Sequence, residues 1–252
     1  MFRAEHLAKS FSGKAVLKDI SFSLNPGEIL AVLGPSGCGK TVLIQILTGL
    51  LPYDSGEIYF NEQTLSSFTG VRYKEYLLQL GFMFQQGALF DFLTVGENLA
   101  LPLNEHFKLK RSEVQSRISD ILQQLDLGNI QNKMPYELSG GMLKRVSLGR
   151  AMIMRPKVLF CDEPCSGLDP LRKKMVYDFI RRMRDTYQST VLVVTHDAEL
   201  VPEFADRALV LYNGNIAAIE KNAAKPSKYF MDFSKGIWSY TEGEKGHATL
   251  SA

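Results

Sequence analysis

The chain has 252 residues, of which 45% are hydrophobic and 22% are charged, and its formal net charge is +2. A chain of this size and composition can bury a proper core as one large domain, or as one domain with a sizeable insertion. The near balance of charges excludes a general electrostatic field for nucleic acid or anionic lipid.

The N-terminal residues and the cysteines bear on the cellular compartment. The first residues lack the uninterrupted apolar core and the small-residue cleavage site of a signal peptide, so none is expected there. The longest apolar runs suit buried strands and are too short to cross a bilayer. The cysteines show no C-x-x-C or metal-ligand spacing, which favours a reduced, cytosolic setting. We expect Cys161 and Cys165 to pack as small apolar residues; the third cysteine is Cys38.

The first part of the chain predicts two strands, a glycine-rich turn and a helix. Two strand-like runs flank the turn at 25–27, and the second run, Ile29–Leu33, is apolar throughout, as expected of a strand covered on both faces. A helix is predicted from Lys40, and Gly49 and Pro52 end it. Its apolar residues at helical spacing are Val42, Leu43, Ile46, Leu47 and Leu50.

The rest of the chain predicts one more strand, a helical block and a return to strands. Residues 55–61 read as a strand, helical patterns dominate from about Gln86 to Arg155, and strands return at 157–162 and 190–195. The helical block includes one clear apolar stripe: Val114, Ile118, Ile121, Leu122 and Leu125. Residues 208–220 predict a hairpin over Asn213-Gly214.

This order of elements predicts an α/β fold. The expected architecture is a mostly parallel sheet with flanking helices, an antiparallel β part near the N-terminus, and a helical subdomain inserted at about 87–155. We expect one domain over 1–225 and an aromatic-rich tail over 226–252.

Residues 34–41, GPSGCGKT, fit the pattern G-x-x-x-x-G-K-[ST] and lie between a predicted strand and a predicted helix, which makes a P-loop NTPase the expected fold. Gly34, Gly37 and Gly39 allow positive φ and leave room for phosphate oxygens, while N–H groups converge at the helix start. Lys40 should reach the β- and γ-phosphates, and the Thr41 hydroxyl should ligate Mg²⁺. The predicted nucleotide-binding residues here are Gly34, Pro35, Ser36, Gly37, Cys38, Gly39, Lys40, Thr41 and Val42.

The run KVLFCDEP places two carboxylates where a buried strand ends, which is where ligands bind in open α/β sheets. Asp162 is predicted to hold Mg²⁺ through water, and Glu163 to orient and deprotonate the attacking water. The alternative is a pair of solvated acids that cap a strand.

The run TVLVVTHD repeats this pattern. His196 is predicted to contact the γ-phosphate and the water, whereas in the alternative Thr195 or Asp197 simply caps the next helix. The other histidines, at positions 6, 106 and 247, have no such context and are expected to be structural or on the surface.

A second anion-seeking helix start lies at 138–151, LSGGMLKRVSLGRA. Two such starts in one chain would compete for one γ-phosphate. We therefore expect a second copy of the chain, with two ATP molecules held head to tail between two-fold-related subunits.

The motifs GPSGCGKT, FMFQQ, LSGG, VLFCDEP, SGLDP and VVTHD occur in the order seen in ABC-transporter ATPase subunits, which the chain resembles from about Phe2 to Glu220. The resemblance implies ATP hydrolysis with Mg²⁺ as cofactor, and an integral-membrane permease as partner. It implies that Phe11 stacks on adenine and that Gln85 touches Mg²⁺ and senses the permease. It also implies that Ser139, Gly140 and Gly141 bind the opposite γ-phosphate and that Asp169 crosses the dimer.

Two positions depart from the family pattern. Val42 replaces a hydroxyl residue that contacts the α-phosphate in most members, a loss of about 0.5–1.5 kcal/mol. Met142 replaces the usual Gln, and with the segment FQQGALFDFLTVGENLALPL it resembles the ATPases of Mla-type, Mce-associated lipid transporters. That branch implies an Mce-type lipid-binding protein and a STAS-domain protein as further partners, and a peripheral location on the cytoplasmic side of the inner membrane.

Several alternatives stay open. The segment GALFDFLTV either lines a groove for a permease helix or forms ordinary core, with Phe90 and Phe92 as the test positions. The tail aromatics either pack on the chain's own sheet or reach a neighbouring protein. The cargo is either phospholipid or another solute, such as amino acids or lipoproteins. A DNA-maintenance ATPase needs a long coiled coil that 41–138 cannot hold, and a ribosome-associated regulator of the tandem type needs two cassettes.

Overall fold

The computed structural model describes residues 2–85, 87–225 and 230, and the chain forms two compact units. The first unit combines Met1–Thr69 with Leu192–Ala252, and the second is Gly70–Val191. The helical insertion predicted at about 87–155 lies wholly within the second unit.

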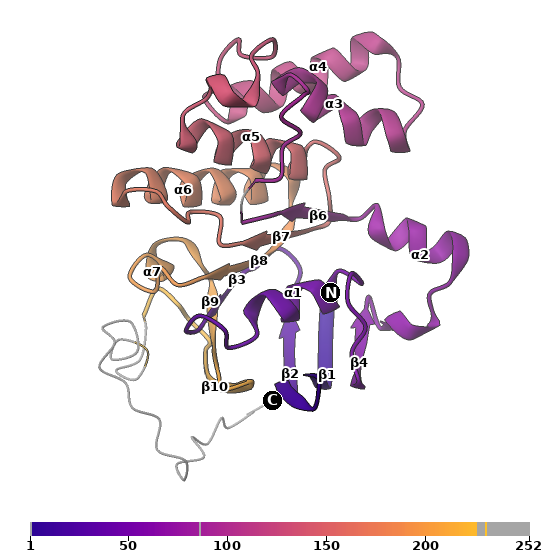
Figure 1. Cartoon of the computed structure of the whole chain (residues 1–252), viewed down its shortest axis with the longest axis vertical. Coiled ribbons are helices and arrows are strands. Elements are labelled where there is room, and N and C mark those ends of the chain that lie inside the picture. Colours follow the sequence, from indigo (N-terminus) through magenta and orange to yellow (C-terminus); the bar gives the residue numbers. More distant parts are fainter. Residues whose placement is uncertain (1, 86, 226–229, 231–252) are drawn as a thin grey trace. The chain divides into compact units, whose positions relative to one another are not determined.

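The first unit contains an antiparallel sheet in the order β2-β1-β4-β5, of which Figure 1 labels β2, β1 and β4. Its strands are β1 (Phe2–Phe11), β2 (Lys14–Leu24), β4 (Ser55–Phe60) and β5 (Gln63–Thr64). Buried and exposed side chains partly alternate along β1 and β2, as in a sheet with one covered face. This is the antiparallel β part that the sequence predicted.

The first unit also contains strands in the order β10-β9-β3-β8. They are β3 (Ile29–Leu33), β8 (Thr190–Thr195), β9 (Arg207–Tyr212) and β10 (Asn215–Glu220). Strand β3 is buried throughout and pairs in parallel with β9, while β9 and β10 form the predicted hairpin. Asn213 and Gly214 have φ of 48° and 77°, the positive values that a tight hairpin turn requires.

Helix α1 (Lys40–Leu47) begins where the sequence predicted and buries Leu43, Ile46 and Leu47. The predicted stripe is wrong at Leu50, which lies past the helix end and is 63% exposed. The remaining short elements of this unit are a 3-10 turn at Leu65–Ser67 and helix α7 (Val201–Phe204).

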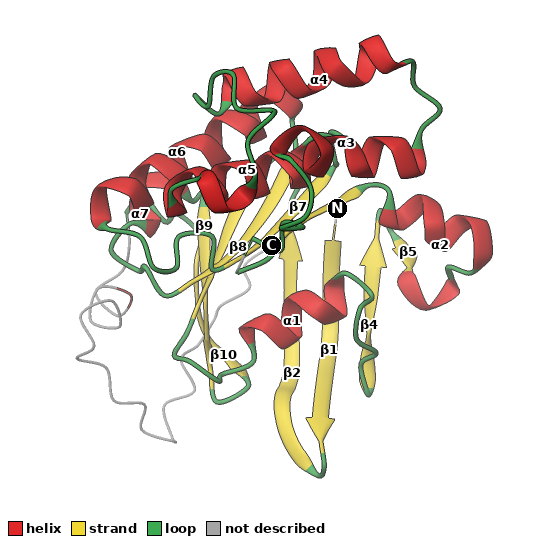
Figure 2. Ribbon diagram, turned by 45° about the horizontal axis from the view of Figure 1, so that its top comes forward, coloured by secondary structure: helices red, strands yellow, loops and turns green. Residues whose placement is uncertain are grey.

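The second unit is mainly helical, and its strands β6 (Leu80–Met83) and β7 (Val158–Asp162) pair in parallel. The central helix is α5, which contacts α3, α4, α6 and β6. Figure 2 shows it among α3, α4 and α6. The helices are α2 (Gly70–Leu77), α3 (Val95–His106), α4 (Arg111–Gln124), α5 (Gly140–Met152) and α6 (Pro170–Tyr187), with a 3-10 turn at Pro135–Glu137. The predicted stripe of α4 is buried as expected.

Close packing holds α5 against α4. A Cβ at Gly149 would lie 2.8 Å from the Leu125 Cδ1, so the two helices meet where α5 has no side chain. The Arg145 guanidinium donates to the carbonyl oxygens of Leu125 and Asp126, at 2.9 and 3.1 Å, where α4 ends. These contacts fix the helix that opens at Ser139.

Two expectations concern the membrane and the tail. Across the described ranges, no helix has both the length and the apolar character that crossing a bilayer demands. Of the tail aromatics, Phe230 is fully buried, whereas Tyr229, Phe233, Trp238 and Tyr240 lie outside the described residues.

The turn at Gly214 allows a sharp stability test. A Cβ there would lie 2.5 Å from the Val16 carbonyl oxygen, and the Gly214 carbonyl accepts a hydrogen bond from the Lys18 N–H at 2.7 Å. We expect Gly214→Ala to lower the free energy of unfolding by about 1–3 kcal/mol in urea titrations. Gly13→Ala is the control, because Gly13 has a φ of 79° but nothing within 4 Å of its Cβ position. Equal losses in the two variants would show that the clash is irrelevant.

Candidate functional site

The glycine-rich loop connects β3 to α1 in the first unit, and its glycines serve two different purposes. Gly37 and Gly39 have φ of 80° and 107°, as predicted. Gly34 does not share this conformation, which corrects the prediction for that residue. A Cβ at Gly34 would lie 2.3 Å from the Leu211 carbonyl oxygen, so this position is glycine because β9 passes so close.

Lys40 begins α1 and is 8% exposed. Its ammonium group donates to the carbonyl oxygens of Gly34 and Pro35, at 2.7 and 3.0 Å, which folds the side chain over the loop. No side chain caps the helix, since its N-cap is Gly39. A buried cation next to a helix start that offers backbone N–H groups is a set of donors fitted to a polyphosphate.

The other site residues predicted in the first unit differ in their exposure to solvent. Thr41 is exposed and Val42 is half-buried, on the first turn of α1. His196 is exposed and directly follows β8, the neighbour of β3 in the sheet. The Asp197 N–H donates to the Thr195 hydroxyl at 3.0 Å, and α7 has Leu200 as its N-cap. The alternative in which Thr195 or Asp197 caps the next helix is therefore wrong.

The predicted carboxylates lie in the second unit, at the end of β7. Asp162 is the last residue of this fully buried strand and is itself 5% exposed, so it is not a solvated acid. Glu163 has a φ of 47°, a left-handed conformation that is uncommon outside glycine and that clusters at functional sites. Cys161 and Cys165 are buried as expected, and burial raises the pKa of the Cys161 thiol.

The second helix start has the form that the sequence predicted. Ser139 is the N-cap of α5, and its hydroxyl accepts from the Met142 N–H at 3.4 Å. A Cβ at Gly140 would meet nothing within 4 Å, and one at Gly141 would lie 3.7 Å from the Arg172 Cδ. The start of α5 is thus open, with an arginine side chain beside it.

Asp169 has a local structural role. It is the N-cap of α6, where its carboxylate accepts from the Arg172 N–H at 3.1 Å and lies 3.2 Å from the Arg172 Nε. The sequence assigned Asp169 only to the dimer, although Asp before Pro at a helix start is itself a capping signal.

Lys144 was not singled out from the sequence. It lies on α5 and donates to the backbone carbonyl of Gln85, which is exposed. Burial lowers the pKa of the Lys144 ammonium, and the nearby Cys165 and Glu163 side chains oppose that shift. Lys144 therefore links the loop of Gln85 to the helix that opens at Ser139.

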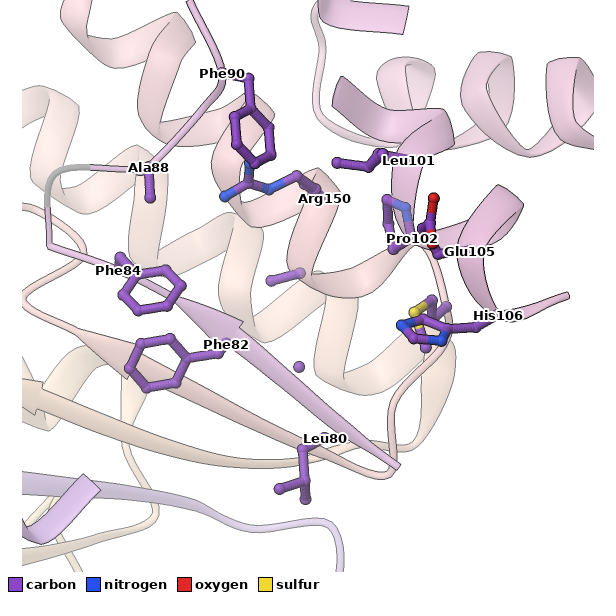
Figure 3. A pocket seen from close by; sticks show the side chains of 13 residues that line it. Leu80, Phe82, Phe84, Ala88, Phe90, Leu101, Pro102, Glu105, His106 and Arg150 are labelled. Carbon is purple, nitrogen blue, oxygen red and sulfur yellow. The ribbon is translucent and has the colours of Figure 1, made fainter. Parts of the chain in front are cut away.

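A cavity of about 530 Å³ lies in the second unit, between β6, the loop after it, α3 and α5 (Figure 3). Phe82, Phe84, Phe90, Leu101 and Pro102 give it an apolar lining. Figure 3 shows the Phe90 ring above the Arg150 guanidinium, which is 5.9 Å from the ring centroid.

The exposure of Phe90 and Phe92 decides whether their segment forms ordinary core. Phe90 is 42% exposed and Phe92 is 76% exposed, so neither is core. Phe90 lines the cavity, and Arg150 donates to the Gly87 carbonyl at 3.2 Å beneath it. Burial lowers the pKa of the Arg150 guanidinium.

The donor set also suits magnesium. Within residues 2–85, 87–225 and 230 there is no group of three or more His, Cys, Asp or Glu side chains that could hold a metal alone. Magnesium in nucleotide sites takes one or two protein ligands and the phosphates, rather than an all-protein cage. The Thr41 hydroxyl in the first unit and the Asp162 carboxylate in the second are each the kind of oxygen ligand that this pattern uses.

A glycine-rich loop between a buried strand and a helix, with a buried lysine at the first helical position, defines a P-loop NTPase. Residues 17–166 match the family model described as ABC transporter, and the chain belongs to that family. Cassettes of this family bind ATP with Mg²⁺ and hydrolyse it, and they dimerise and work with membrane permeases. The chain is accordingly an ATPase.

Three relatives illustrate the range of the family. The sulfate/thiosulfate import ATP-binding protein CysA of Nitrosomonas europaea is 38% identical over 97% of this chain and 68% of its own length. The chloroplastic protein TRIGALACTOSYLDIACYLGLYCEROL 3 of Arabidopsis thaliana is 38% identical over 82% of this chain and 65% of its own length. A dimeric ATP-binding cassette in a post-hydrolysis state, bound to ADP and Pi, has a TM-score of 0.80 and 27% identity, and covers 88% of this chain and 98% of that one.

The cavity depends on Asn98, a fully buried amide on α3. Its Oδ1 accepts from the Phe90 N–H at 2.9 Å, and its Nδ2 donates to the carbonyl oxygens of Phe90, Leu93 and Thr94, at 3.0 to 3.1 Å. We expect Asn98→Ala to lower the free energy of unfolding by about 2–4 kcal/mol in urea titrations, because it leaves these buried groups unpaired. Asn104→Ala, on the exposed side of the same helix, is the control and should change little. A loss no larger than that of the control would contradict this role.

Proposed function

We propose that the chain is the ATP-hydrolysing subunit of an ABC transporter that moves phospholipid with an Mce-type system, at the cytoplasmic side of the inner membrane. The observation that carries the ATPase part of the proposal is the presence of two phosphate-seeking helix starts, one at Lys40 and one at Ser139. One ATP needs both, and the copy that supplies the Ser139 turn is a second molecule.

In this proposal the residues of the P-loop bind the nucleotide. Lys40 and the N–H groups of residues 34–41 hold the β- and γ-phosphates, and the Phe11 ring stacks on the adenine. Val42 leaves the α-phosphate without the side-chain hydroxyl that most members provide. Thr41, Asp162 and Gln85 hold Mg²⁺, which when bound neutralises charge on the phosphate oxygens.

The hydrolytic step belongs to Glu163 and His196. Glu163 takes the proton of the attacking water at its carboxylate, and His196 orients that water against the γ-phosphate. Ser139, Gly140 and Gly141 of the partner subunit complete the phosphate shell, and Asp169 contacts the partner across the two-fold axis. Loss of the γ-phosphate removes these contacts and releases the dimer.

The cavity beside Gln85 is the proposed dock for the permease. Its apolar lining and its exposed phenylalanines suit an amphipathic helix, and the Gln85 loop borders it. The segment 84–103 and Met142 support the lipid branch, since both resemble Mla-type ATPases. A relative named for trigalactosyldiacylglycerol, a glycolipid, supports the same branch, whereas a relative named for sulfate import supports another cargo. The proposed further partners are an Mce-type protein and a STAS-domain protein.

The Glu163→Gln variant tests the hydrolytic role. Without the carboxylate the water cannot be deprotonated, so turnover should fall by about 100-fold or more while ATP binding remains. The ATP-bound variant should then accumulate as a dimer in analytical ultracentrifugation. Ser139→Ala in the same background should reduce that dimer, because the second phosphate contact is lost. Near-normal ATP hydrolysis by Glu163→Gln would refute the assignment.

Cargo is tested on the assembled transporter. The membrane protein that co-purifies with the full chain in mild detergent is reconstituted in vesicles that contain fluorescent phospholipid. We expect ATP-dependent movement of the lipid with the wild-type chain and none with Glu163→Gln. Accumulation of radiolabelled sulfate with no lipid movement would overturn the lipid assignment and leave the ATPase assignment intact.

A further inference from the structure

A buried lysine lies beside the proposed adenine platform, and the nucleotide chemistry described so far does not use it. Lys9 is 9% exposed, although lysine is among the residues least often buried. Its Nζ donates to the Asp54 Oδ1 at 2.7 Å and lies over the Phe11 ring, 5.4 Å from its centroid. This ammonium group therefore joins the end of β1 to the turn before β4.

Asp54 acts on the same stretch of backbone with its second oxygen. Pairing of β1 with β4 ends at Ala8, which lies opposite Ser55. Beyond that point the Ser10 N–H donates to the Asp54 Oδ2 at 2.6 Å, and the Asp54 N–H donates to the Ala8 carbonyl at 2.9 Å. Asp54 thus takes part in three hydrogen bonds, and together they hold the last residues of β1.

Phe11 follows the residues of β1 that Asp54 holds. It is the last residue of β1 and is 43% exposed, so much of the ring is open to solvent. Lys9 and Phe11 are two residues apart on β1, and the ammonium group lies close enough to the ring for a cation–π contact. An exposed ring at a strand end would ordinarily sample several rotamers, and the cation beside it restricts that freedom.

We propose that Lys9 and Asp54 are positioning residues that hold the Phe11 ring ready for the nucleotide base, and so set the base-dependent part of nucleotide affinity. The proposal rests on the proposed stacking of Phe11 on adenine. A platform that is already ordered loses less conformational entropy when the base stacks on it. Lys9 itself contacts no phosphate in this scheme, which separates its effect from that of Lys40.

The test compares two ligands of the full-length chain by isothermal titration calorimetry with Mg²⁺. ATP carries the base, and inorganic tripolyphosphate carries the phosphates alone. We expect Lys9→Met and Asp54→Asn each to weaken ATP binding by about threefold to tenfold and to leave tripolyphosphate binding unchanged. In ATPase assays the KM should rise while kcat stays, since neither residue touches the reacting groups.

The chain offers a matched control on the same strand. Arg3 lies over the Tyr59 ring, 4.2 Å from its centroid, and pairs with Glu5 and Glu62. Arg3→Met therefore removes a cation, a ring contact and ion pairs away from Phe11, and it should change neither affinity. Lys9→Arg keeps a cation that can lie over the ring, and it should retain ATP affinity close to that of the wild type.

The binding results distinguish a failure of the Lys9–Asp54 proposal from a failure of the assignment of Phe11 to the base. If Lys9→Met and Asp54→Asn weaken both ligands equally, the pair merely supports the fold, and the proposal is overturned. If Phe11→Ala weakens ATP but Lys9→Met does not, the platform stands without its positioning pair. If Phe11→Ala leaves ATP affinity unchanged, the base assignment fails, and the ATPase function survives on the P-loop residues.

Discussion

The hydrogen bonds of the Lys40 ammonium to the carbonyls of Gly34 and Pro35 are the interactions on which the nucleotide site depends. They hold a cation over a loop whose backbone turns only because Gly37 and Gly39 accept positive φ. The loop can lie so close to β9 because position 34 has no Cβ. A phosphate ligand can then exchange with the two carbonyls for the same ammonium at little conformational cost.

The start of α5, like that of α1, offers backbone N–H groups as donors, but it has no lysine at its first helical position. Its N-cap hydroxyl makes only a long bond to the Met142 N–H, at 3.4 Å, and the side chain of Arg172 approaches Gly141. Such a helix start is weaker than the P-loop as an anion site by itself, because it lacks a buried cation. In the proposed dimer, this difference makes the P-loop the first site to bind ATP and the Ser139 turn the later, closing contact.

Much of this architecture could be predicted, because it depends on local patterns. The P-loop, the buried strands before Gly34 and Asp162, the α4 stripe and the Asn213-Gly214 turn all have short sequence signals. Strand β1 was not placed individually, since its register shifts and the positive φ of His6 break the alternation. Lys9, Asn98 and Lys144 depend on partners distant in sequence or on loop backbone, and residue type alone carries no signal for such contacts. Buried polar residues inside apolar patterns, such as Asn98, were the one available hint.

The motor residues cannot by themselves reveal the cargo. Relatives named for sulfate import and for a glycolipid are equally similar to this chain, at 38% identity, so overall identity does not separate the two cargoes. The surface that differs by cargo must be the one that touches the permease. In the proposed dock, Asn98 holds the backbone of the exposed Phe90, and the half-buried Arg150 guanidinium donates to the Gly87 carbonyl. Under this proposal, specificity for a permease rests on side chains between β6 and α3, and comparison of that segment among family members is the route from the ATPase to its cargo.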